Sequence, residues 1–262
     1  MANHKPWVTM SGRPGRRVGH GEPFQPTAAL NDINQATEHL LKTAATFHDA
    51  DVRAPSLLPG WSRGHVLTHL ARNADSTRNL LIWARTGIET PDYPNLQARA
   101  ADIEAGATRT AIELLADLRR SAARLAADFA QMPPSAWEHP VRWTIGGPGP
   151  VRWSLRGRLQ EVLIHHVDLA AGYTPADWPS PFVAATLANV VRGFSNRTDA
   201  PVMRLHAEDT DHWYDVGDTR PTDTPEIRGT QRALLAWLIG RSRGADLSTT
   251  HHQPLPLVPP LH

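Results

Sequence analysis

The chain has 262 residues, enough for one large domain or two smaller ones, and its 40% hydrophobic and 20% charged residues are typical of an ordinary soluble protein. A formal net charge of +1 argues against a nucleic-acid-binding protein, because such proteins usually carry a marked basic excess. No apolar run approaches the roughly 18 residues that a membrane helix needs, and the N-terminus lacks the apolar core of a signal peptide, so we expect a cytoplasmic protein with no membrane partner. The sequence has no cysteine, so a metal ion would have to be bound by His, Asp or Glu, and thiol chemistry would need a thiol from outside the chain.

Both ends of the chain differ in composition from the rest. Residues 1–27 are rich in Gly, Pro and Arg without periodicity, and residues 247–262 are rich in Pro, so we expect both segments to be disordered. Between them, helical periodicity predicts a mainly α protein, with a four-helix bundle over residues 28–175 and a small α+β domain over residues 176–246.

The predicted bundle contains four long amphipathic helices. The second begins with Ser62 as its cap, and the fourth has Ser154 as a candidate cap and Gly172 as a candidate stop. The four helices are expected over about residues 28–48, 62–85, 96–131 and 154–172. In the predicted C-terminal domain we expect a helix, two strands and a second helix, over about residues 181–194, 202–206, 212–216 and 224–243.

The predicted fourth helix carries three chemically active side chains on one stripe. Glu161, His165 and Asp168 are spaced by four and three residues, which places them on the same face of a helix. Most residues around them are apolar, so this face should be buried, and buried carboxylates and imidazoles need a partner or a metal ion. Glu161 and His165 are therefore candidate metal ligands. A surface ion pair is the simpler alternative, because the Glu-x-x-x-His spacing is common on exposed helices.

A catalytic metal site usually has three protein ligands and an open position, so a third ligand is expected from a facing helix. The predicted second helix offers His65 and His69, which are four residues apart. We favour His69, because it lies one turn further into the helix and should be deeper in the bundle, and we keep His65 as the alternative. Asp168 then fits a supporting role, in which it orients a ligand imidazole or a bound water.

Several segments of the sequence resemble one known family. In chain order they are LPGWSRGHVLTHLARNAD (residues 58–75), ARAADIEAG (98–106), EVLIHHVDL (161–169) and WLIGR (237–241). Over about residues 28 to 244 the chain resembles the mycothiol-dependent maleylpyruvate isomerase family. The resemblance implies a DinB-like four-helix bundle followed by a small domain similar to sterol-carrier proteins.

The same resemblance assigns roles to individual residues. It places the family's metal ligands on His69, Glu161 and His165, in agreement with the helix spacing. The resemblance also implies that mycothiol is the cofactor. We expect zinc as the ion, because imidazole and carboxylate ligands suit it, although ligand type also allows nickel, cobalt or iron.

Three further functional positions are implied by the resemblance. The family's functional Asp and its first functional Arg fall on Asp168 and Arg99. Its C-terminal functional Arg matches Arg241, where the spacing is looser and Arg243 is a near neighbour. In this interpretation Arg99 and Arg241 bind the carboxylates of the substrate, since a guanidinium matches their bidentate geometry.

The implied activity is the cis–trans isomerisation of maleylpyruvate to fumarylpyruvate. A thiolate adds to the cis double bond, the resulting single bond rotates, and expulsion of the thiolate leaves the trans isomer. The metal ion would act as a Lewis acid and would lower the thiol pKa. The expected partners are thus a small electrophilic substrate and a low-molecular-weight thiol; the sequence gives no indication of the oligomeric state.

Two other functions fit the same residues. A mycothiol S-transferase or thiol-exchange enzyme would share the addition step and differ only in the fate of the adduct. A non-catalytic ligand-binding module would hold a structural ion, and that ion would have four protein ligands instead of three.

Overall fold

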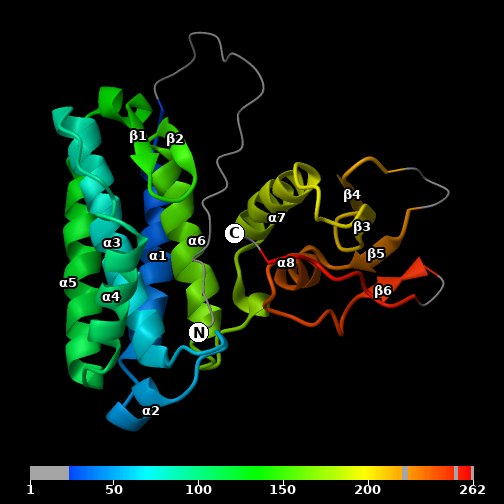
Figure 1. Ribbon diagram of the computed structural model, residues 1–262, viewed down its shortest axis with the longest axis horizontal. Coiled ribbons are helices and arrows are strands. Elements are labelled where there is room, and N and C mark those ends of the chain that lie inside the picture. Colours follow the sequence, from blue (N-terminus) through cyan, green and yellow to red (C-terminus); the bar gives the residue numbers. More distant parts are fainter. Residues whose placement is uncertain (1–23, 220–223, 251–252, 261–262) are drawn as a thin grey trace. The chain divides into compact units, whose positions relative to one another are not determined.

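The computed structural model describes residues 24–219, 224–250 and 253–260 (Figure 1). These residues form two compact units, which divide between Gly172 and Tyr173. Most of the predicted N-terminal extension, residues 1–23, lies outside the described residues. None of the helices in the described ranges is long and apolar enough to cross a membrane.

The N-terminal unit is a helical bundle. Its helices are α1 (Thr27–Ala44), α2 (Asp49–Arg53), α3 (Arg63–Thr86), α4 (Leu96–Ala107), α5 (Ala111–Ala130) and α6 (Trp153–Asp168). Helix α3 packs against α4, α5 and α6, and α1 packs against α5 and α6. The predicted four-helix bundle is therefore formed by α1, α3, α5 and α6, which run side by side in Figure 1. Between α5 and α6 the chain forms a 3-10 turn (Pro134–Glu138) and a hairpin of β1 (Pro140–Trp143) and β2 (Gly147–Pro150) near one end of the bundle.

The predicted third helix is wrong in one respect, because the chain divides it into α4 and α5. Thr110 caps α5 by accepting a hydrogen bond from the backbone N–H of Glu113, and the Glu113 side chain accepts one from the Thr110 backbone (2.9 Å). This reciprocal pair is a capping box, and its Thr-x-x-Glu pattern marks a new N-terminus inside the predicted helix. Helix α4 thereby becomes a separate element that packs on α3.

The start of the bundle also differs in detail from the prediction. Helix α1 ends at Ala44, and the chain begins the short α2 after His48. The side chain of Asp51 accepts a hydrogen bond from the His48 backbone N–H (2.8 Å), which stabilises this second start. Ser62 caps α3 as predicted, with its side chain accepting from the backbone N–H of His65.

Both ends of α6 differ from the prediction. The helix begins at Trp153, so Ser154 is not its cap; the Ser154 hydroxyl instead donates to the carbonyl oxygen of Val151 (2.6 Å). It ends at Asp168, before Gly172, because its last turn is bonded to other elements. The Arg63 side chain donates to the carbonyl oxygens of Leu169 (2.6 Å) and Ala170 (2.8 Å), which satisfies groups that the helix leaves free.

A compact apolar core fills one part of the bundle. The Trp137 ring is buried and stacks on Phe129 with ring centroids 6.1 Å apart. Burying a side chain such as Phe129 stabilises the fold by about 1.5–3 kcal/mol. The core also draws on the C-terminal halves of α3 and α5 and on the hairpin and the start of α6, through Leu80, Leu81, Ala84, Leu125, Met132, Val141, Val151 and Leu155. Outside this cluster, the N-terminal half of α3 and the C-terminal half of α6 bury the polar side chains of His69 and His165 alongside apolar residues such as Leu70.

Two glycines allow α3 and α4 to approach closely. A Cβ atom at Gly64 would collide with the carbonyl oxygen of Ala107, and one at Gly106 would collide with the Thr68 side chain. Larger residues at these positions would therefore push the two helices apart. Their close approach fixes the position of Arg99, which lies in the first turn of α4.

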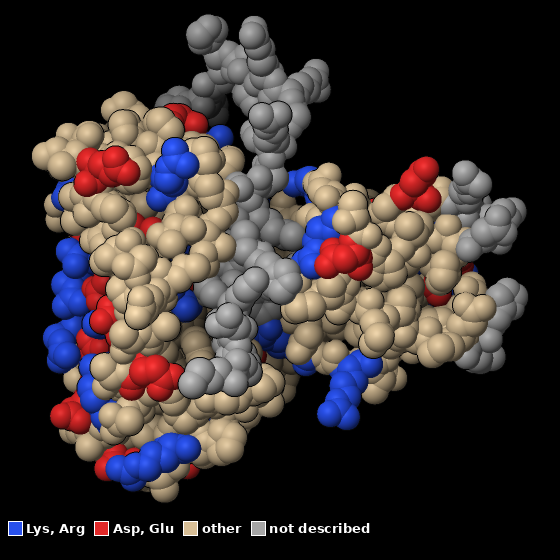
Figure 2. All heavy atoms as spheres, in the orientation of Figure 1, with Lys and Arg blue, Asp and Glu red and all other residues tan. Residues whose placement is uncertain are grey.

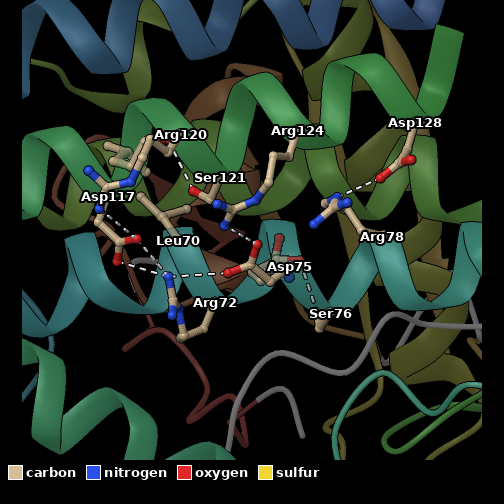
Figure 3. Close-up of polar contacts among 12 residues, drawn as sticks. Leu70, Arg72, Asp75, Ser76, Arg78, Asp117, Arg120, Ser121, Arg124 and Asp128 are labelled. Carbon is tan, nitrogen blue, oxygen red and sulfur yellow. Dashed lines mark hydrogen bonds and ion pairs between the residues drawn. The ribbon is translucent and has the colours of Figure 1, made fainter.

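A row of ion pairs joins α3 to α5 on the surface of the bundle, and we call it the α3–α5 ion-pair row (Figure 3). Its closest contacts are Arg72–Asp117 (2.8 Å), Asp75–Arg124 (2.7 Å) and Arg78–Asp128 (2.5 Å). Asp117 also accepts a hydrogen bond from Arg109 (2.9 Å). Figure 2 shows acidic and basic side chains interspersed along one side of the N-terminal unit, as expected for a surface on which charges pair.

The C-terminal unit combines two helices with a mixed sheet. The helices are α7 (Ser180–Ser195) and α8 (Gln231–Leu238), preceded by a 3-10 turn (Pro175–Asp177). In the described part of this unit the sheet has the order β4-β3-β5-β6, with β3 (Met203–Ala207), β4 (His212–Val216), β5 (Glu226–Gly229) and β6 (Ser248–Thr249). Strand β3 pairs antiparallel with β4 and parallel with β5, and its buried residues alternate along the strand.

The last predicted helix is wrong over its first part. Residues 226–229 form β5, and α8 begins only at Gln231, where Thr230 accepts a hydrogen bond from the backbone N–H of Ala233. Strand β5 pairs with β3, which lies far away in the sequence, so local periodicity could not indicate it. Strand β6 likewise falls in the Pro-rich segment that was predicted to be disordered.

Candidate metal centre

Three side chains from α3 and α6 meet inside the bundle, and we call them the His–Glu–His cluster. His69 Nε2 lies 2.8 Å from Glu161 Oε2 and 3.1 Å from His165 Nε2, and His165 Nε2 lies 3.3 Å from the same Glu161 oxygen. The side chains of His69 and His165 are 3% and 2% exposed, whereas Glu161 retains 12%. The two imidazoles are therefore buried, and Glu161 is the member of the cluster with the most solvent exposure.

The structure brings His69, and not His65, to the pair on α6. The His65 ring lies at the start of α3, where its Nδ1 atom accepts a hydrogen bond from the Ser62 backbone N–H (3.1 Å). Its Nε2 atom lies 3.4 Å from Glu104, on the surface. His69 is one turn further along α3, which places it opposite α6, as the sequence predicted.

Each histidine of the cluster has a second polar partner on its Nδ1 atom. Asp168 Oδ2 lies 2.8 Å from His165 Nδ1, and Asp168 is fully buried. Arg99 Nη2 lies 3.0 Å from His69 Nδ1, and its guanidinium also faces the ring of Tyr93 at 5.7 Å. Asp168 and Arg99 thus contact the cluster without belonging to it.

The cluster titrates unusually because its groups are buried and close together. Burial lowers the pKa of His69 to about 4, against the opposing effect of Glu161, so this imidazole is neutral at pH 7. Burial alone would raise the pKa of Glu161, but His69 and His165 hold the pKa of this carboxyl well below its usual value. For His165 burial acts to lower the pKa, and the hydrogen bonds to Asp168 and Glu161 outweigh it and raise the pKa above 6.5.

The donor set of the cluster fits a small divalent ion. A tetrahedral zinc ion with bonds of about 2.0–2.1 Å holds its ligand atoms about 3.3 Å apart. The three donor atoms are 2.8–3.3 Å apart, so a slight expansion would accommodate such an ion. Two imidazoles and one carboxylate leave a fourth position for a molecule from outside the chain.

Arg241 lies in the C-terminal unit, directly after α8, whereas the other predicted site residues lie in the bundle. Its backbone N–H donates to the carbonyl oxygen of Ala236 (2.7 Å) and so caps the C-terminus of α8. Gly240, which precedes it, has the positive φ (72°) that is common at such a helix end. Its Nη1 donates to the carbonyl oxygen of Ile239 (2.9 Å). The substrate role of Arg241 stays a prediction.

Two polar side chains beside the cluster are not predicted from the sequence. Tyr93, in the loop before α4, is half-buried near Arg99 and Glu161, and its partial burial raises the pKa of its hydroxyl. Arg158 lies three residues before Glu161 on α6 and is 2% exposed. An arginine among apolar residues one turn before a predicted ligand was a usable signal for Arg158, whereas no local pattern indicated Tyr93.

Fold and site together define a helical-bundle protein with a candidate metal-binding centre of two histidines and one glutamate. The chain belongs to the mycothiol maleylpyruvate isomerase family. Residues 11–170 match the family described as "Mycothiol maleylpyruvate isomerase N-terminal domain", and residues 177–259 match the "MDMPI C-terminal domain". The resemblance found in the sequence is thereby confirmed at the level of the family.

Two solved structures are similar to the chain over most of its length. One is the crystal structure of the mycothiol-dependent maleylpyruvate isomerase, with 27% identity and a TM-score of 0.85. The other is a histidine-to-alanine mutant of that isomerase, with 26% identity and the same TM-score. Each comparison covers 90% of this chain and 97% of the solved chain. Among curated protein sequences, none matches.

Proposed function

We propose that this chain is a metal-dependent, mycothiol-using enzyme that converts maleylpyruvate to fumarylpyruvate. The observation that carries the proposal is the His–Glu–His cluster, buried on α3 and α6 of a bundle that belongs to the isomerase family. In this proposal His69, Glu161 and His165 hold one zinc ion. When bound, the ion supplies positive charge that favours a thiolate and stabilises negative charge on a substrate oxygen. Mycothiol supplies the nucleophile that adds to the double bond and leaves after rotation.

Arg99 has a role that follows from its contact with His69. An arginine has donors only, so Arg99 must donate to His69 Nδ1, and the ring proton must then be on Nε2, which donates to Glu161. Metal binding through Nε2 requires the proton on Nδ1 instead. The Arg99–His69 hydrogen bond must therefore break when the site is loaded. The released guanidinium can then bind a carboxylate of the substrate, which supports the predicted role of Arg99.

Asp168 would keep His165 ready for the metal ion. Its carboxylate accepts the Nδ1 proton of His165 (2.8 Å) and leaves Nε2 directed toward Glu161 and His69. A carboxylate in this position fixes the ring orientation and raises the basicity of the ligand nitrogen. In this proposal Asp168 therefore acts through His165 and does not touch the substrate.

An assay of the zinc-loaded protein with maleylpyruvate, with and without mycothiol, tests the proposal. We expect isomerisation that requires both the ion and the thiol, with fumarylpyruvate identified by chromatography. The matched control is Arg72→Ala, which alters α3 on its outer face and should leave turnover unchanged. Transfer of the thiol to a model electrophile without isomerisation would reject the proposal in favour of an S-transferase, and an ion with four protein ligands would favour a non-catalytic module.

A further inference from the structure

Arg158 is a buried cation that uses only one of its three nitrogen atoms in hydrogen bonds with the described residues. Its Nη1 atom donates to the carbonyl oxygen of Leu70 (2.9 Å) and to Asn73 Oδ1 (2.7 Å), both on α3. Its Nε and Nη2 atoms are buried and have no hydrogen-bond partner among the residues that the structure describes. Native interiors seldom leave buried donors unpaired, so these two atoms need an explanation.

The two unpaired atoms form one edge of the guanidinium. The Nε–H and one Nη2–H bond are parallel and point the same way, which is the fork that matches the two oxygens of a carboxylate. The contacts of Nη1 with Leu70 and Asn73 fix the plane of the group from the opposite side. Arg158 therefore presents a held, preorganised fork instead of a mobile charge.

Among the residues that the structure describes, no Asp or Glu side chain binds this fork. Within the described part of the chain, no Asp or Glu oxygen lies within 4.0 Å of Arg158 or of Arg99, although both arginines are buried. Burial lowers the pKa of Arg158 only to about 10, so it is charged at pH 7. A buried charge without a close counter-ion is strongly unfavourable, and a bound anion would relieve this.

The position of Arg158 connects the fork to the metal centre. Residues three apart on a helix share a face, so Arg158 lies one turn from Glu161. Glu161 and Tyr93 lie close enough to Arg158 to favour its charged form electrostatically, and Arg99 faces the ring of Tyr93 at 5.7 Å. Once a divalent ion neutralises Glu161, the positive charge of the two arginines has still less compensation from the protein.

We propose that Arg158 binds a carboxylate of the substrate through Nε and Nη2, next to the His–Glu–His cluster. The identity of the substrate as a small dicarboxylate rests on the function proposed above, whereas the carboxylate chemistry rests on the fork itself. Arg158 is thereby a substrate-binding residue in the bundle, additional to Arg99.

The test measures binding of maleate, a small cis-dicarboxylate, to the zinc-loaded protein by titration calorimetry. Replacing the fork by a point charge in Arg158→Lys should weaken maleate binding about 10- to 100-fold, the range expected for a lost bidentate charge-assisted contact. Zinc content should stay unchanged. Arg152→Lys is the matched control, because Arg152 lies at the start of the same helix in an exposed pair with Glu138 and should leave maleate affinity unaltered.

If Arg158→Lys does not fold, Asn73→Ala tests the same claim, because it removes one contact that orients the guanidinium and keeps the charge. We expect maleate to bind roughly 2- to 10-fold more weakly to that variant. A crystal structure with maleate should place one carboxylate on Nε and Nη2 of Arg158. Unchanged maleate affinity in the folded variants, or a water molecule in place of the carboxylate, would overturn the inference.

The outcomes separate this inference from the proposed function. Maleate binding that depends on Arg158, in a protein that does not isomerise maleylpyruvate, would sustain the carboxylate site and reject the isomerase. Isomerisation with the same KM and the same maleate affinity in Arg158→Lys would reject the carboxylate site and sustain the isomerase.

Discussion

Helix α3 carries polar side chains on two faces, and their partners differ in kind. On its outer face Arg72, Asp75 and Arg78 belong to the α3–α5 ion-pair row, where arginines on one helix meet carboxylates on the other (Figure 3). On its inner face His69 meets a second histidine as well as a glutamate, at 3.1 and 2.8 Å. Two imidazole nitrogens facing each other at this distance stabilise nothing unless a proton or a metal ion lies between them.

This difference distinguishes side chains that hold two helices together from side chains that are placed to bind a ligand. In the ion-pair row each carboxylate finds its cation within the chain, so the row joins two helices and needs no ligand. In the interior His69, Glu161 and His165 bring three candidate ligand atoms together, and the fork of Arg158 has no hydrogen-bond partner among the described residues.

His69→Ala should abolish metal binding and activity while the protein stays folded. Loss of an outer partner of a ligand typically lowers metal affinity 10–100-fold, so loss of a ligand should lower it by more than about 100-fold. Metal analysis after dialysis and circular dichroism would measure the two effects. Arg72→Ala on the outer face of the same helix is the control, and equal metal loss in both variants would contradict the distinction between the faces.

Asp168→Asn should lower zinc affinity and turnover about 10- to 100-fold, because an amide cannot hold the His165 ring as a carboxylate does. Competition with a chromophoric chelator would measure the affinity. Asp117→Asn is its counterpart in the ion-pair row, where Asp117 accepts from Arg72 and Arg109. That variant should lose about 1–3 kcal/mol of unfolding free energy and keep its zinc affinity. Loss of zinc affinity in Asp117→Asn but not in Asp168→Asn would mean that Asp117, and not Asp168, supports the metal centre.

Zinc affinity should fall as the pH falls, by about tenfold per pH unit where one proton competes with the ion. His165 has a raised pKa, so it keeps its proton to a higher pH than an ordinary imidazole, and the ion must displace that proton from the ring. The pKa of His69 is lowered to about 4, so His69 should not compete near neutral pH. Calorimetry in two buffers of different ionisation enthalpy would measure the protons released. Affinity that is constant between pH 6 and about pH 8 would show that His165 is not a ligand.

Arg124→Ala should have the smallest effect, about 0.2–1 kcal/mol of unfolding free energy, because its pair with Asp75 is partly exposed. The loss should shrink in 1 M salt, where exposed charges are screened. Urea unfolding at low and high salt would measure it, with Arg119→Ala, an exposed residue of the same helix, as the control. A loss above about 2 kcal/mol would mean that the row stabilises the bundle far more than surface pairs do.

The sequence predicted the part of the site that depends on helix geometry. The spacing of Glu161, His165 and Asp168 places them on one stripe of a helix, and depth in the helix predicts that His69, and not His65, lies beside them, which is where the structure has it. Those predictions succeed because a helix repeats at a fixed interval.

What the sequence could not supply depends on distant packing. The fork of Arg158 is recognisable only when its contacts with Leu70 and Asn73 on α3 are known. Strand β5 pairs with a strand far away in the sequence, so its residues were assigned to a helix. The break before α5 is different, because the Thr-x-x-Glu pattern of Thr110 and Glu113 is visible in the sequence, although the apolar periodicity on both sides of it predicts one continuous helix.

A crystal structure of the zinc-replete protein would show whether one ion joins α3 to α6. We predict one ion bound by Nε2 of His69, Nε2 of His165 and a carboxylate oxygen of Glu161, with a fourth ligand that does not come from the chain. Arg99 should then no longer contact His69 Nδ1. An ion located elsewhere, or one that is enclosed by four protein ligands, would contradict the account.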